Sequence, residues 1–159
     1  MIYKDIAIKE VLEEAGYTTF EVACCMFRVF EEELESMGIE TNPSVDEMAV
    51  SKISFNGTSN GTLVLSVCEG LFDTVAVNML GQDTVSNVER DSALCEITNI
   101  IAGNVIDKFT DVDELCVLSP PVRANNVNHN SFLESGYEAF NAKLFVDEGV
   151  ATINLYLKK

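Results

Sequence analysis

The order of helix, proline-bearing link and β-hairpin occurs twice along this chain of 159 residues. The first copy spans about residues 15–67 and the second about residues 86–157. The strand that closes each copy, at residues 61–67 and 149–155, starts with glycine and then follows a strand-like alternation. The repeat predicts a single α+β domain over residues 1–159 with pseudo-twofold symmetry. Its two hairpins would share one antiparallel sheet, and its long helices would pack on one face of that sheet.

Local sequence patterns predict where the helices and strands of this domain lie. Apolar side chains at the helical period predict helices at residues 6–37, 69–80 and 86–109. Alternating segments predict hairpin strands at residues 51–55, 62–67, 136–146 and 150–157. We expect the first helix to break, if anywhere, at Gly16 and to end at Gly38. Pro120 and Pro121 predict irregular backbone or the edge of the sheet.

In the first helix the expected core face consists of the apolar residues Phe20, Ala23, Phe27, Phe30 and Leu34.

The chain is strongly acidic, with 26 Asp and Glu against 10 Lys and Arg, a net charge of −16. This charge repels nucleic-acid phosphates and anionic membranes, and the basic residues do not cluster apart from Lys158 and Lys159. The N-terminus has no apolar region typical of a secretory signal, and no apolar run is long enough to cross a membrane. We therefore expect a soluble, cytoplasmic protein that binds neither nucleic acid nor membrane.

The motifs of most common enzyme chemistries are missing from the sequence. The five cysteines are odd in number and include no C-x-x-C pair, so neither a disulfide framework nor a zinc site is expected. The single histidine, His129, lies in an asparagine-rich segment and is expected to be ordinary surface. No glycine-rich phosphate loop occurs. We expect no metal site and no cofactor bound by this chain itself.

The helix at residues 86–109 has two distinct faces. At 100° per residue, one side carries an apolar stripe expected to face the core, formed by Leu94, Ile97, Ile101, Val105 and Phe109. The opposite side carries four residues that we call the motif face: Ser92, Glu96, Asn99 and Gly103. A solvated surface is the simplest interpretation of such a face.

Gly103 argues for more than a solvated surface. A glycine in a helix interior costs about 1 kcal/mol relative to alanine. On a face that buries nothing, that cost brings no benefit to folding, whereas it does allow another molecule to approach the helix closely. The motif face therefore also fits a docking surface, on which Glu96 and Asn99 project together.

The residues around this face resemble a known signature. Residues 95–104, CEITNIIAGN, together with residues 118–122, LSPPV, resemble the E-x-x-N helix and proline link of the CheC/CheX/FliY chemotaxis phosphatases, and most of all CheX. The resemblance implies a phosphatase that acts on the aspartyl phosphate of a CheY-like response regulator. In the first copy, Glu21 and Cys24 stand at the matching positions. Because a thiol cannot replace an amide, we expect one site, on the second helix.

The resemblance also implies a role for each site residue. Asn99 would orient the attacking water, and Glu96 would pair with the receiver's active-site lysine, with Ser92 and Gly103 on the docking surface. The receiver would supply Mg²⁺, and the chain would form a homodimer. Because long-range attraction between two acidic proteins is weak, attraction would be local, at Glu96 and at basic neighbours such as Arg90. The sequence departs from the family after Pro121, where a glycine turn is common.

Two other interpretations remain open at this point. The chain could be a non-catalytic module that binds a receiver, as the related middle domains of flagellar switch proteins do. It could also be a structural subunit with an incidental motif. The intact pair of Glu96 and Asn99 favours the phosphatase, since a scaffold has no need of it.

Overall fold

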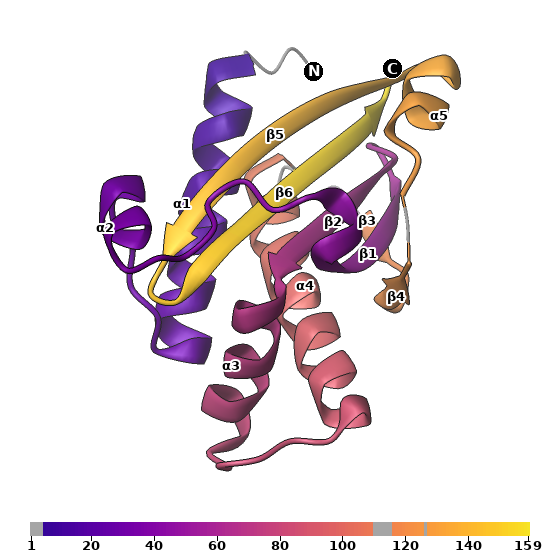
Figure 1. Ribbon diagram of the computed structural model, residues 1–159. Coiled ribbons are helices and arrows are strands. Elements are labelled where there is room, and N and C mark those ends of the chain that lie inside the picture. The colour runs from indigo at the N-terminus through magenta and orange to yellow at the C-terminus, as the bar shows by residue number, and fades with distance from the viewer. Residues whose placement is uncertain (1–4, 110–115, 126) are drawn as a thin grey trace.

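Six strands form one antiparallel sheet, which helices cover on both faces (Figure 1). The computed structural model describes residues 5–109, 116–125 and 127–159. The helices are α1 (Asp5–Cys24), α2 (Glu31–Ser36), the 3₁₀ turn η1 (Val45–Glu47), α3 (Glu69–Leu80), α4 (Asn87–Phe109) and α5 (His129–Glu134). The strands are β1 (Met48–Gly57), β2 (Gly61–Cys68), β3 (Cys116–Leu118), β4 (Val122–Ala124), β5 (Tyr137–Val146) and β6 (Gly149–Lys158).

The two predicted hairpins meet at the centre of the sheet. The strand order is β3-β1-β2-β6-β5, and β4 also pairs with β1. The closing strands of the two copies, β2 and β6, pair antiparallel from Gly61 opposite Leu157 to Val67 opposite Ala151. This pairing relates the two hairpins by a pseudo-twofold axis. It confirms the predicted α+β class and the shared antiparallel sheet.

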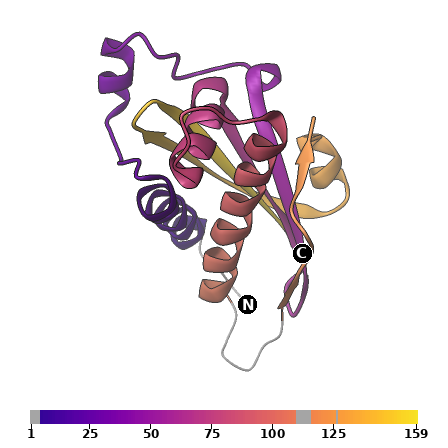
Figure 2. The ribbon, with the colours of Figure 1, turned by 90° about the horizontal axis from the view of Figure 1, so that it is seen from below.

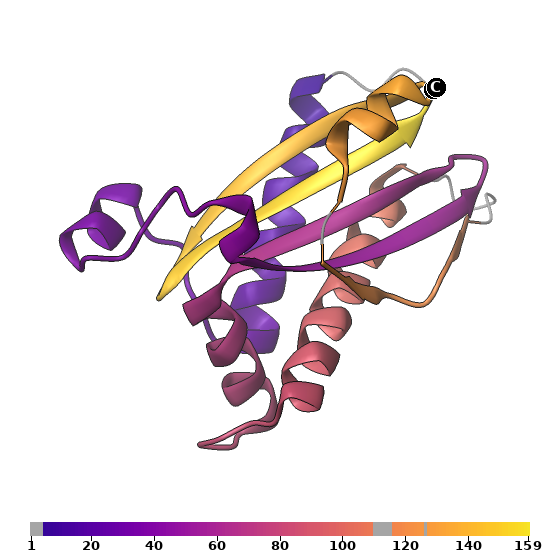
Figure 3. The ribbon, with the colours of Figure 1, turned by 45° about the vertical axis from the view of Figure 1, so that its right-hand side comes forward.

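Three long helices cover one face of the sheet. Figures 2 and 3 show α1, α3 and α4 on this face, with α1 along β5 and α4 along β1. Of the predicted core stripe on α4, Leu94, Ile97, Ile101 and Val105 are all 0% exposed. The side chain of Phe109 lies outside the description. Gly16 does not break α1: a Cβ there would lie 2.4 Å from Leu144 Cδ1, so glycine lets α1 approach the sheet closely.

The short helix α5, which the sequence did not predict, packs on the other face (Figure 3). The ring of Phe132 stacks on Tyr156 with ring centroids 4.1 Å apart. His129 is exposed, as expected of surface, but its Nδ1 lies 2.9 Å from Tyr156 Oη. The prediction of an ordinary surface residue was therefore incomplete, because this contact ties α5 to the sheet.

The predicted first helix, residues 6–37, is wrong in its length and its break point. The helix ends at Cys24, and Cys25 has the left-handed φ of 54°. The chain then follows the end of β5: Val29 N–H donates to Phe145 O at 3.0 Å, and Asp147 N–H donates to Phe27 O at 3.0 Å. Hydrogen bonds to a strand edge thus override the helical period, which continues through this segment in the sequence.

As a consequence, Phe27 and Phe30 are 54% and 73% exposed and do not belong to the core face that the helical period predicted. Gly38, with a φ of 77°, follows the separate helix α2, so it ends α2 and not one long helix.

The predicted start of the long helix α4 is confirmed by its capping box. Ser86 N–H donates to Glu89 Oε1 at 3.0 Å, and Glu89 N–H donates to Ser86 Oγ at 3.1 Å. Pro120 and Pro121 lie between the short strands β3 and β4 at the edge of the sheet, as their missing N–H groups require.

Substitution of Cys25 tests whether its left-handed backbone conformation, at the end of α1, is strained. A non-glycine residue in the left-handed region costs roughly 1–2 kcal/mol, which glycine avoids. We expect Cys25→Gly to raise the melting temperature by about 2–4 °C per kcal/mol gained, as thermal unfolding measures. Cys25→Ala, which removes the thiol but keeps a Cβ, is the matched control and should melt like the parent. A lower melting temperature for Cys25→Gly would contradict the account.

Candidate functional site

The motif face of α4 points away from the core. Ser92 and Glu96 are exposed, while Asn99 and Gly103 are half-buried. Residues three apart on a helix are neighbours, so the Glu96 carboxylate and the Asn99 amide project side by side. Within the described part of the chain, neither side chain has a hydrogen-bond or ion-pair partner. Both groups are therefore available to a ligand.

The opposite side of this helix segment is buried against the sheet. Thr98, fully buried, donates from Oγ1 to Leu94 O at 2.8 Å. Ser51 on β1 donates from Oγ to Cys95 Sγ at 3.8 Å. The contact to Ser51, the burial of Thr98 and the apolar stripe fix the rotation of α4 about its axis, which in turn fixes the direction of the motif face.

Gly103 lies against open space. A Cβ placed on it would meet nothing within 4 Å. Gly61 differs sharply, since a Cβ there would lie only 2.3 Å from Tyr156 O. Packing among the described residues explains Gly61 but does not explain Gly103.

The matching positions in the first copy do not form a second site. Glu21 is exposed, but Cys24, three residues on, is 0% exposed. Burial, with the neighbouring Cys25 as a smaller cause, raises the pKa of the Cys24 thiol to about 12. The thiol is therefore protonated and enclosed at neutral pH, and it has neither the exposure nor the hydrogen-bonding capacity of Asn99.

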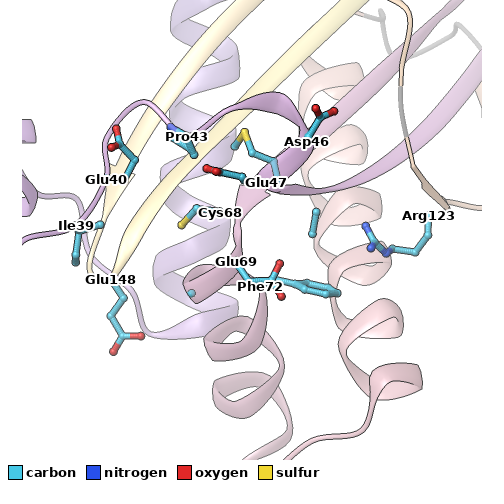
Figure 4. Close-up of a pocket in the computed structure, with 13 residues that line it drawn as sticks. Ile39, Glu40, Pro43, Asp46, Glu47, Cys68, Glu69, Phe72, Arg123 and Glu148 are labelled. Atoms are coloured by element: carbon cyan, nitrogen blue, oxygen red, sulfur yellow. The ribbon is translucent and has the colours of Figure 1, made fainter.

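A cleft of about 710 Å³ lies away from the motif face (Figure 4). Its rim carries the carboxylates of Glu40, Asp46, Glu47, Glu69 and Glu148. Arg123 and Phe72 lie at the end of the cleft away from Ile39 (Figure 4). None of the lining residues belongs to the motif face. Glu96 and Asn99 therefore do not belong to this cleft.

Two basic residues near the start of α4 are engaged inside the chain. Arg90, expected as a local attraction for the partner, lies 3.8 Å from Glu69 and 3.9 Å from Asp73. Arg123, which the sequence did not single out, donates from Nε to Asp91 Oδ1 at 2.8 Å. The only sequence signal for Arg123 is its place directly after the proline link.

Neither a metal-binding cluster nor a membrane-spanning helix is found among the described residues. Their His, Cys, Asp and Glu side chains do not gather in a group of three or more that could hold a metal ion. Within the same residues, no helix is both long and apolar enough to cross a membrane.

Comparison with known proteins decides the family. The family model described as "Chemotaxis phosphatase CheX" matches residues 49–143, which include the motif face and the proline link. The chain belongs to the CheX family. No curated protein sequence matches the chain at a significant level.

Solved structures share the CheX fold with this chain. A CheX from Desulfovibrio desulfuricans has a TM-score of 0.69 at 13% identity, over 95% of this chain and 99% of that one. The CheX–CheY–BeF₃–Mg²⁺ complex from Borrelia burgdorferi has a TM-score of 0.65 at 15% identity, over 94% and 97%. The FliM middle domain from Helicobacter pylori has a TM-score of 0.52 at 11% identity, over 99% and 94%. At these identities the likeness concerns the fold alone.

Gly103 gives a direct test of the open motif face. Because an alanine Cβ would meet nothing there, Gly103→Ala should gain helix propensity and stabilise the fold by up to ~1 kcal/mol. Thermal unfolding should show a higher melting temperature than the parent. Gly61→Ala is the matched control and should melt lower, because its Cβ would strike backbone. A Gly103→Ala variant that melts lower would indicate a close contact at this position, such as a dimer interface.

Proposed function

We propose that this chain hydrolyses the aspartyl phosphate of a CheY-like receiver domain, using the motif face of α4. The observation that carries the proposal is the adjacent, unpartnered pair Glu96 and Asn99 on an exposed helix of a CheX-family chain. A relative of the same fold is known in complex with CheY, BeF₃ and Mg²⁺, which supports a receiver as the partner. In this scheme Mg²⁺ belongs to the receiver.

Asn99 would act on the attacking water. Its side-chain carbonyl accepts a hydrogen bond from the water, and its NH₂ group can donate to a nearby oxygen. The water oxygen then forms a bond to phosphorus while the bond from phosphorus to the aspartyl oxygen breaks. The aspartate leaves as a carboxylate, and both protons of the water remain on the phosphate product, H₂PO₄⁻. An uncharged amide suits this position because a carboxylate would repel the phosphoryl oxygens.

Glu96 would fix the orientation of the receiver. Its carboxylate is the one charge on the motif face, and it would pair with the receiver's active-site lysine as the complex forms. Since the chain carries a net charge of −16, this local pair matters more than long-range steering. We further propose that the chain works in the cytoplasm and as a homodimer, a state that analytical ultracentrifugation measures.

A non-catalytic binding module is the second candidate. The fold likeness to a FliM middle domain supports it. The two functions differ in one measurement, the release of phosphate from a CheY receiver charged with acetyl phosphate. A binding module would form a complex with the receiver without changing the lifetime of its phosphoryl group.

We expect Asn99→Ala to lose about 100-fold or more of the receiver dephosphorylation rate. The side chain lies on the outer face of α4, so its truncation leaves no core cavity and the melting temperature should change little. Phosphate release and circular dichroism measured on the same samples test both points. Full activity, or a fold that melts much earlier, would contradict the role given to Asn99.

We expect Glu96→Gln and Glu96→Ala to weaken receiver engagement. Breaking an ion pair that is desolvated at an interface costs far more binding free energy than breaking one in water, since an ion pair in water contributes only ~0–1 kcal/mol. Binding of a BeF₃-loaded CheY receiver should weaken, and the dephosphorylation rate should fall at sub-saturating receiver. Glu35→Gln, which removes one exposed carboxylate on α2, away from the motif face, is the control. Unchanged binding by both Glu96 variants would make Glu96 ordinary surface.

Gly103→Leu tests the clearance on the motif face. The variant should fold, since the position is open, but the leucine side chain should obstruct the receiver and weaken binding. Titration with the BeF₃-loaded receiver measures this. Binding equal to that of Gly103→Ala would place the receiver elsewhere on the surface.

A further inference from the structure

The strand that follows α4 contains one extra residue at its proline link. On β3, Leu118 pairs with Phe55 of β1, whereas on β4, Val122 pairs with Lys52. Between these pairs, the three residues Ser119, Pro120 and Pro121 stand opposite the two residues Ile53 and Ser54. The edge strand therefore has a β-bulge at the prolines.

Hydrogen bonds hold this bulge in place. Ser119 N–H donates to Ser54 O at 2.8 Å, and Ser54 N–H donates to Ser119 Oγ at 3.0 Å. Neither Pro120 nor Pro121 has an N–H to leave unpaired. The register change is thus a fixed feature of the edge strand.

The bulge decides which face of the sheet Arg123 occupies. Arg123 pairs with Ser51, whose side chain faces α4 and contacts Cys95. Paired residues of antiparallel strands project to the same face, so Arg123 also faces α4. Without the extra residue, Arg123 would pair with Val50 and project to the opposite face, into the apolar cluster that holds Tyr156.

On the helix-bearing face, one guanidinium joins three elements. Arg123 donates from Nε to Asp91 Oδ1 on α4 at 2.8 Å and from Nη1 to Val50 O on β1 at 2.6 Å. Its guanidinium carbon lies 4.9 Å from the ring centre of Phe72 on α3. Asp91 stands five residues, less than two helical turns, before Glu96. These bonds fix the first turns of α4 against the edge of the sheet.

We propose that Arg123 is a positioning residue for the motif face: the proline bulge turns it toward α4, and its bonds to Asp91 and Val50 hold the helix so that Glu96 and Asn99 meet the receiver correctly. This inference rests on the proposed phosphatase function. Because a misplacement of about 1 Å in a reacting group can cost 100-fold in rate, a small shift of α4 should be visible in turnover.

The test uses the full chain and a CheY receiver charged with acetyl phosphate and Mg²⁺, at a temperature where every variant is folded. Arg123→Ala should lower kcat about tenfold or more, because Asn99 is misplaced, and should raise the receiver concentration at half-maximal rate by a smaller factor, because Glu96 shifts with it. The kcat of Arg123→Lys should lie between those of the parent and Arg123→Ala, since an ammonium group can bond to one of the two partners that the guanidinium bonds. Lys52→Ala, which removes one exposed positive charge from the other face of β1, is the matched control and should behave like the parent.

Chemical rescue separates positioning from general destabilisation. Millimolar guanidinium chloride should restore part of the kcat of Arg123→Ala, because Arg123 borders an open cleft through which a guanidinium ion can enter. An equal concentration of NaCl should not restore it, and neither salt should restore Asn99→Ala. Loss of activity without rescue, or a loss confined to receiver binding, would overturn the positioning role.

The remaining outcomes separate this inference from the proposed function. Parental kcat in Arg123→Ala, alongside an inactive Asn99→Ala, would overturn the role of Arg123 and leave the phosphatase intact. A parent chain without phosphatase activity, or an Asn99→Ala variant with full activity, would overturn the proposed function and this inference with it.

Discussion

The antiparallel pairing of β2 with β6 is the interaction on which the rest of the molecule depends. It joins the hairpins of the two copies into one sheet, and it is made by the strands that close those copies. The pairing creates a single continuous face long enough to seat α1, α3 and α4 side by side (Figure 2). Since one face of α4 packs on the sheet, its other face, which carries Glu96 and Asn99, is turned away from the core.

Features with a local cause could be predicted from the sequence. The start of α4 depends on Ser86 and Glu89, which contact each other within one turn. The apolar stripe and the motif face follow from the helical period alone, and the CheX-like motif identified the face that carries Glu96 and Asn99. The alternating hairpins and the repeat were sufficient for the fold class.

Features with a distant cause could not be predicted. The end of α1 at Cys24 depends on hydrogen bonds to Phe145 and Asp147, more than a hundred residues later in the chain. The helical period gives no sign of such a competitor. Likewise, the face that Arg123 occupies depends on strand register across a bulge, which single-sequence patterns do not fix. Helix α5 could not be predicted because it is held by the stacking of Phe132 on Tyr156 of the distant strand β6.

The early end of α1 has a further consequence for the sheet. The segment after Cys24 lies along the outer side of β5 near Val146, where Arg28 forms an isolated bridge. On the other outer side, Pro120 and Pro121 interrupt the edge strand and offer no N–H groups. The end of β5 near Val146 and the proline-bearing part of the other edge are therefore poor places for adding a strand from an unfolded or misfolded chain. Fewer free backbone N–H groups at these two places leave less opportunity for edge-to-edge association, a consequence separate from any activity of α4.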